Sequence, residues 1–196
     1  MALPKYDRTK RRQNFQQLPK GAYVLKILYA KEEPNRNGSG THLVVSYDIA
    51  EGEYKDYFLN LYNSREGEDK KWPADGQYYL TVPGDNAEAY VWTNWNSFFA
   101  DLEDSNNGFV FGGDPAQLKG KLIGGKFANI QSEYNGTVYD HIRMRWTCVA
   151  EDVRQDKAGK MPNDRLIKAT AARPAFPAGE DFVSVPEGYD DELPFT

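Results

Sequence analysis

An Asn-Gly pair at positions 135–136 separates two runs of alternating apolar and polar residues, GKLIGGKFANIQSEY before it and TVYDHIRMRWTCVAED after it. Both residue types accept the positive φ angles of a two-residue turn, so the pattern predicts an antiparallel β-hairpin. In the second run, alternation predicts a core face with Val138, Asp140, Ile142, Met144, Trp146 and Cys148. The opposite face is predicted to be basic and aromatic, with Tyr139, His141, Arg143, Arg145 and Thr147.

Three further strands are predicted ahead of this hairpin. Residues 23–30 and 42–49 alternate with period two, and PNRNGSG at 34–40 is a strong turn signal between them. Glu51-Gly52 marks a second turn, after which EYKDYFLNLY at 53–62 predicts a third strand. Residues 62–76 are predicted to be a loop, and residues 78–83 either a short strand or part of that loop.

Between the third strand and the hairpin, the hydrophobic period changes. Val91, Trp95, Phe98, Phe99 and Leu102 fall on one helical face, which predicts a helix over 86–104 with Asp85 as its N-cap. The order of three strands, a helix and a hairpin is that of the OB-fold. We therefore expect a mainly β protein, a five-stranded OB-like antiparallel barrel with one helix between strands 3 and 4.

Charge divides the 196-residue chain into blocks. The formal net charge is −5 overall, but it is +6 over residues 1–36, −10 over 37–114, +5 over 115–173 and −6 over 174–196. These blocks predict a basic flexible arm at 1–18, a nucleic-acid-binding domain at 19–153, and a linker with a disordered acidic C-terminal tail at 154–196. The single cysteine excludes an intramolecular disulfide, and one cysteine with two histidines cannot build a Cys- or His-rich zinc site.

Several motifs of enzymes are incomplete. GKLIGGK at 120–126 matches the start of a phosphate-binding loop, but Phe127 stands where that motif needs Ser or Thr, and the surrounding pattern is that of a strand. Asp48 with Glu53 and Lys55 resembles the spaced carboxylates and lysine of metal-dependent nucleases, an alternative that stays open. Cys148 is predicted to be an inert core thiol. We expect no enzyme activity, no cofactor and no metal.

Basic and aromatic side chains on strand faces favour nucleic-acid binding instead. Aromatic rings stack on bases of any sequence, while Lys and Arg follow the phosphates. The candidate DNA-binding residues are Lys26, Tyr54, Phe58, Lys126, Tyr139, His141, Arg143 and Arg145.

The chain ends in an acidic run followed by Leu-Pro-Phe, and this end resembles the acidic tip of bacterial single-stranded-DNA-binding proteins. The resemblance implies that the tip recruits replication or repair proteins through Asp190, Asp191, Glu192, Leu193, Pro194 and Phe195. Thr196 follows Phe195, whereas the family tip ends in Phe, so docking through the terminal carboxylate is in question.

The opening, LPKGAYVLKILYAKEEPNRNGSGTHLVVSYDIAEGEY, is similar to a group of phage and prophage proteins from replication and recombination modules. That resemblance, over residues 18–150, implies an OB-fold bacteriophage protein that binds single-stranded DNA during DNA replication and DNA recombination. It places the protein in the cytoplasm of a bacterial host, with no membrane partner. A homo-oligomer stays open, and so does an accessory factor that binds a protein partner but no DNA.

Overall fold

Five antiparallel strands form one sheet in the order β3-β2-β1-β4-β5. The computed structural model describes residues 16–35, 38, 40–67 and 69–167. The strands are β1 (Gly21–Pro34), β2 (Thr41–Ile49), β3 (Gln77–Thr81), β4 (Leu122–Tyr134) and β5 (Thr137–Cys148). The sheet is open, with β3 and β5 at its two edges. The prediction of a mainly β protein with five antiparallel strands is confirmed, and the closure of the strands into a barrel is not.

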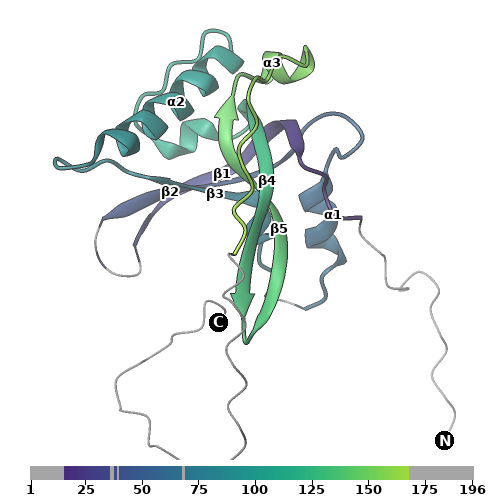
Figure 1. The fold of residues 1–196 in the computed structure, drawn as a ribbon. Coiled ribbons are helices and arrows are strands. Elements are labelled where there is room, and N and C mark those ends of the chain that lie inside the picture. The colour runs from purple at the N-terminus through teal and green to yellow at the C-terminus, as the bar shows by residue number, and fades with distance from the viewer. Residues whose placement is uncertain (1–15, 36–37, 39, 68, 168–196) are drawn as a thin grey trace, which may run out of the picture.

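Three helices flank the sheet in the described part of the chain: α1 (Tyr57–Ser64), α2 (Ala89–Ser105) and α3 (Ala150–Arg154). Single 3₁₀ turns, η2 (Ala74–Gly76) and η3 (Pro115–Leu118), precede β3 and β4. The β4–β5 hairpin crosses the other three strands steeply, with α1 and α2 on opposite sides of the molecule (Figure 1). No helix within the described ranges is long and apolar enough to span a membrane.

The prediction of a third strand at 53–62 is wrong, because much of this segment belongs to helix α1. Tyr54, Phe58 and Tyr62 are four residues apart, and this spacing fits one strand face as well as one helix face. The helix is favoured by a buried carboxylate from β2. Asp48 accepts hydrogen bonds from the backbone N–H groups of Phe58 and Leu59, both at 2.9 Å, and these groups have no partner inside the helix. The actual third strand is β3.

The hairpin prediction is confirmed. β4 and β5 pair from Gly124 opposite Cys148 to Tyr134 opposite Thr137, and the turn residues Asn135 and Gly136 have φ angles of 49° and 73°. The helix prediction is also confirmed, with a later start. α2 begins at Ala89 after Glu88, and no side chain caps its first turn, so Asp85 is not the N-cap.

Two β-bulges change which side chains face outward. In β1, Ile27 lies opposite Tyr47 while Tyr29 lies opposite Ser46, so one extra residue between them turns Tyr29 to the outer face of the sheet. In the hairpin, Phe127 lies opposite Met144 while Lys126 lies opposite Trp146. The extra residue in β5 exposes Trp146, so its predicted place on the core face is wrong.

The core lies between the sheet, α1 and α2. Its largest fully buried side chains include Tyr47, Phe58, Phe98 and Phe127. The GKLIGGK motif is not a phosphate loop, because its last five residues, 122–126, form the start of β4. A Cβ atom on Gly125 would lie 2.5 Å from Leu25 Cδ1, so glycine at this position leaves room for core side chains to pack against β4.

The ordered domain extends past the boundary predicted at residue 153. That boundary falls inside α3, and the chain then returns along β4, where Arg165 forms a parallel bridge with Ile130. Asp164 forms a 2.8 Å ion pair with Lys20 at the start of β1. Residues 154–167 therefore belong to the folded domain and not to the linker.

Candidate nucleic-acid interface

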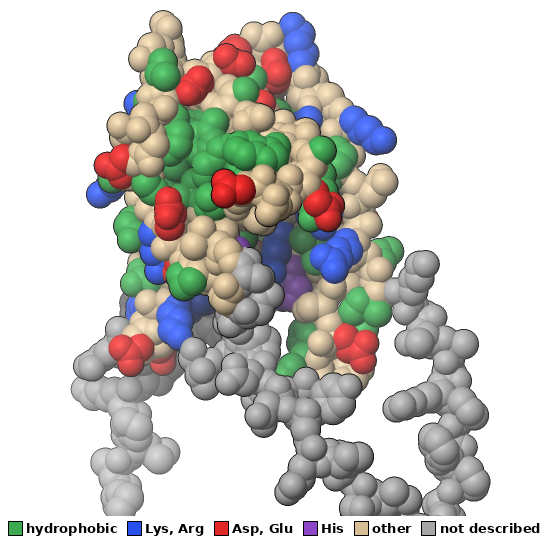
Figure 2. All heavy atoms as spheres, turned by 90° about the vertical axis from the view of Figure 1, so that its left-hand side faces the viewer, with side chains coloured by type: hydrophobic (Ala, Val, Ile, Leu, Met, Phe, Trp, Pro, Cys, Tyr) green, Lys and Arg blue, Asp and Glu red, His purple; other side chains and the backbone are tan. Residues whose placement is uncertain are grey.

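The two edge strands, β3 and β5, leave a groove beneath α2, which we call the seam. Its larger hollow, about 260 Å³, is lined by Tyr78, Asn94, Ser97, Trp146 and Thr147. A smaller hollow of about 70 Å³ lies between β3 and α2, and shares Tyr78 and Asn94 with the larger one. The two hollows therefore lie side by side along α2. Figure 2 views the side that carries α2 and shows apolar side chains above a depression that holds basic and histidine side chains.

Three aromatic side chains of the seam are well exposed. Tyr90 is 62% exposed, Tyr79 52% and Trp146 43%. On α2, Tyr90, Asn94 and Ser97 are spaced by four and three residues, so they share the helix face that lines the seam. Large aromatic rings held at the wall of a groove offer stacking surfaces to the unpaired bases of a nucleic acid.

The outer face of the sheet continues the aromatic surface beyond Tyr79. The ring of His42 meets that of Tyr79 edge to face, with 5.6 Å between centroids. Tyr29 is exposed on the same face, and the charge of Lys31 is close enough to interact with both tyrosines. Lys31 also pairs with Glu33, so this face adds two rings and a cation that already has a carboxylate partner.

Arg145 supplies positive charge close to the seam. Burial raises the pKa of Tyr78, and the nearby guanidinium of Arg145 opposes that rise. Among the described residues, no carboxylate lies within ion-pair distance of Arg145. Its guanidinium is therefore available to a phosphate. On the other side of the seam, Asp101 accepts a 2.5 Å hydrogen bond from Thr147 Oγ1 and ties α2 to β5.

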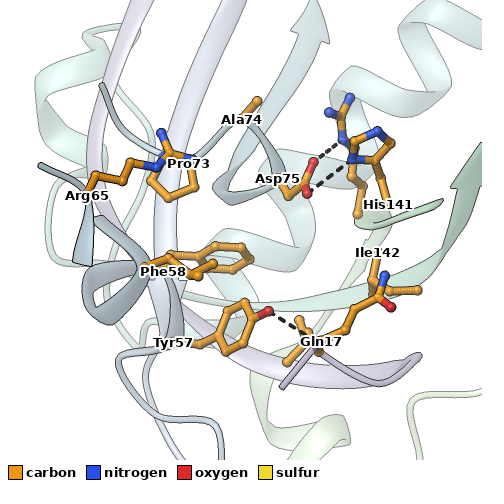
Figure 3. Close-up of a pocket in the computed structure, with 12 residues that line it drawn as sticks. Gln17, Tyr57, Phe58, Arg65, Pro73, Ala74, Asp75, His141 and Ile142 are labelled. Atoms are coloured by element: carbon orange, nitrogen blue, oxygen red, sulfur yellow. Dashed lines mark hydrogen bonds and ion pairs between the residues drawn. The ribbon is translucent and has the colours of Figure 1, made fainter. Parts of the chain in front are cut away.

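Asp75 gathers two more predicted residues, His141 and Arg143. One carboxylate oxygen accepts a 2.5 Å hydrogen bond from Arg143 Nε, and the other lies 3.4 Å from His141 Nδ1. The second ring nitrogen of His141 lies 3.0 Å from Ser132 Oγ. Figure 3 shows Asp75 and His141 in contact on one side of a pocket, with Tyr57 and Phe58 of α1 on the opposite side. We call Asp75, His141 and Arg143 the Asp75 clasp.

The remaining predicted residues are scattered. Lys26 is exposed on β1, opposite Asp48 on β2. Tyr54 packs edge to face on Tyr23, with 6.0 Å between ring centroids, and lies outside the seam. Lys126 donates a 3.4 Å hydrogen bond to the backbone carbonyl of Lys160.

Two further candidates differ in accessibility. Tyr139 is exposed on the part of the β4–β5 hairpin near its turn. Phe58 is fully buried in the core, so the prediction of Phe58 as a stacking residue is wrong. The helix that replaces the third predicted strand turns this ring inward. The basic arm at 1–18 lies largely outside the described residues, and so do all the tip residues, Asp190, Asp191, Glu192, Leu193, Pro194 and Phe195.

The carboxylate expected of a nuclease has another role. Both oxygens of Asp48 accept backbone N–H groups at the start of α1, and the side chain is buried. Within the described ranges, no three His, Cys, Asp or Glu side chains are grouped so that they could hold a metal ion. Cys148 is buried, which raises the pKa of its thiol to about 11.

Sequence reasoning missed four aromatic residues of this surface: Tyr29, Tyr79, Tyr90 and Trp146. Tyr29 and Trp146 were missed because each lies next to a β-bulge, beyond which period-two counting assigns a residue to the wrong face of the strand. Tyr79 lies in the segment 78–83, for which the sequence predicts either a short strand or part of a loop. Tyr90 precedes the apolar helical face, and its offset from that face was the signal that could have identified it.

Neither the family models nor the curated proteins with which this chain was compared include a match.

Proposed function

We propose that this protein binds single-stranded DNA without sequence preference, and that the strand lies in the seam between β3 and β5. One observation carries the proposal. Three exposed aromatic side chains, from three different elements, line two adjacent hollows near Arg145, which has no carboxylate partner in the described structure. Stacking rings with adjacent cations are the combination by which proteins hold single strands.

The shape of the seam favours a single strand over a duplex. The bases of a duplex are stacked on each other and paired, so their faces cannot reach Tyr90 or Trp146. A single strand exposes those faces and can bend into the larger hollow. The polar wall of that hollow consists of Asn94, Ser97 and Thr147. Thr147 already bonds to Asp101. Asn94 and Ser97 remain as polar groups of the hollow, and we expect stacking on the three exposed rings, which tolerates any base sequence, to contribute more to binding than they do.

The wider biological role rests on the sequence resemblances. We propose that the protein acts in phage DNA replication or recombination inside a bacterial cell, as a binding protein with no catalytic step. The acidic tip, from Asp190 to Phe195, would recruit replication or repair proteins. In this view, the domain holds the strand and the tip brings the partner to it.

The proposal is tested by fluorescence anisotropy with a labelled mixed-sequence single strand, the matching duplex and the matching RNA, at several salt concentrations and without Mg²⁺. We expect tight single-strand binding, weak duplex binding, and an affinity that falls as salt rises. Absence of single-strand binding at low salt would overturn the proposal and favour an accessory factor that binds only proteins. Loss of the labelled strand after Mg²⁺ is added would instead identify a nuclease.

A further inference from the structure

The carboxylate of Asp75 lies where a phosphate group could bind to Arg143 and His141. Arg143 and His141 are two residues apart on β5, so their side chains project from the same face of the strand. Both converge on a single carboxylate, and each contacts a different oxygen of Asp75. A phosphate diester also presents two oxygens to such donors, and arginine binds carboxylates and phosphates with the same geometry.

The clasp is open to solvent. The side chains of Arg143, Asp75 and His141 are each about one-third exposed. They border a pocket of about 250 Å³, which Arg65 also lines (Figure 3). The guanidinium of Arg65 donates only to the backbone carbonyl of Lys71 among the described residues. Asp75 is thus the one carboxylate among the described residues of this pocket wall, and the basic side chains of the wall are Arg65, Arg143 and His141.

The clasp and the seam are built from neighbouring parts of the chain, because Asp75 lies three residues before Tyr78 and Arg143 two residues before Arg145. Arg143 and Arg145 lie on the same edge strand, and Arg145 lies near Tyr78 in the seam. A strand whose bases stack in the seam would carry its next phosphates past Arg143. There it would meet the negative charge of Asp75, which already holds the guanidinium at its Nε atom.

We propose that Asp75 is a built-in competitor for nucleic-acid phosphate, and that the Arg143–His141 pair is a phosphate subsite which it masks. The inference rests on the proposed function and adds a regulatory element to it. In the free protein the carboxylate takes the place of phosphate. A bound strand gains little from Arg143 until Asp75 is displaced. The affinity of the protein is therefore held below the value that its basic residues could give.

The direct test is Asp75→Asn, which removes the charge and keeps the shape of the side chain. We expect single-strand affinity at low salt to rise roughly three- to tenfold, because an exposed ion pair no longer competes with the phosphate. The slope of log affinity against log salt should steepen by about 0.7, the value for one additional phosphate contact on a single strand. Unchanged or weaker binding would overturn the inference and assign Asp75 to positioning Arg143.

A double-mutant comparison separates competition from a general change in charge. Arg143→Ala should lower the affinity of the wild-type protein by less than about twofold, and should abolish the gain in the Asp75→Asn background. Glu51→Gln is the matched control, because Glu51 pairs through both oxygens with Arg154 outside the seam. It changes the net charge equally and should alter the affinity by less than about twofold. An equal gain in Glu51→Gln would overturn the inference.

A measurement on single arginine variants keeps the inference testable if Asp75→Asn fails to fold. Arg145→Ala should make the salt slope shallower by about 0.7, whereas Arg143→Ala should leave the slope unchanged. Equal changes in both variants would show that Arg143 already contacts phosphate and would refute competition. If the wild-type protein does not bind single strands at all, the proposed function itself fails, which is a different result from binding that Asp75 does not affect.

Discussion

Replacing Trp146 by alanine is the sharpest test of stacking in the seam. Trp146 is 43% exposed and lines the larger hollow, so more than half of its surface is packed and the rest is accessible to a base. Loss of one base–aromatic stack costs about 1–3 kcal/mol. This corresponds to single-strand affinity that is about 5- to 150-fold weaker at fixed salt. The salt slope should not change, because no phosphate contact is removed.

Trp92→Ala is the matched control for this variant. Trp92 is 44% exposed, nearly the same as Trp146, and it lies on α2 two residues before Asn94. Two residues correspond to about 200° around a helix, which places Trp92 away from the face that lines the seam. Anisotropy titrations should show a change below about twofold for Trp92→Ala. Equal losses in the two variants, with unfolding transitions like that of the wild type, would refute stacking at Trp146.

Three predictions concern the folded domain. Asp48→Ala should lower the free energy of unfolding, measured in urea, by about 2–4 kcal/mol, because three backbone N–H groups lose their acceptor. A loss below about 0.5 kcal/mol would contradict this prediction. Gly125→Ala should cost about 1–3 kcal/mol in the same assay, because its Cβ would lie 2.5 Å from Leu25 Cδ1 and 2.7 Å from Met144 Sδ; a stabilised variant would refute this packing. Burial raises the pKa of the Cys148 thiol from 9.0 to about 11. At pH 8 the thiol should therefore react with a disulfide reagent about 100-fold more slowly in the native protein than in the urea-unfolded protein. Equal rates would show that it is not buried.

Local sequence signals predicted the elements whose cause is local. The turn residues Asn135 and Gly136 adopt positive φ angles, and the hairpin around them pairs as expected. The helical spacing over 86–104 also corresponds to α2. In contrast, α1 depends on the carboxylate of Asp48, which lies ten residues before Phe58 in the sequence. A capping contact of that kind is tertiary, and no pattern within 53–62 contains it.

The candidate site was partly predictable for the same reason. Alternation assigned Arg143 and Arg145 to one basic face of β5; in the structure Arg143 contacts Asp75, and Arg145 lies near Tyr78 of the seam. Alternation fails beyond a bulge, because one extra residue exchanges the two faces of the strand. That is why Trp146 was assigned to the core face, and why period-two counting from Ile27 would place Tyr29 there as well. The joining of β3, β5 and α2 around one groove depends on the three-dimensional arrangement, which the order of the elements alone does not determine.

The central claim is that single-stranded DNA lies along the seam, and photo-crosslinking tests it most directly. A single strand that carries 5-iodouracil would be irradiated on the full-length protein, and the crosslinked residues would be mapped by mass spectrometry. The account predicts crosslinks at Tyr79, Tyr90 and Trp146. Crosslinks confined to Trp92 or to Tyr54, which lie outside the seam, would contradict it.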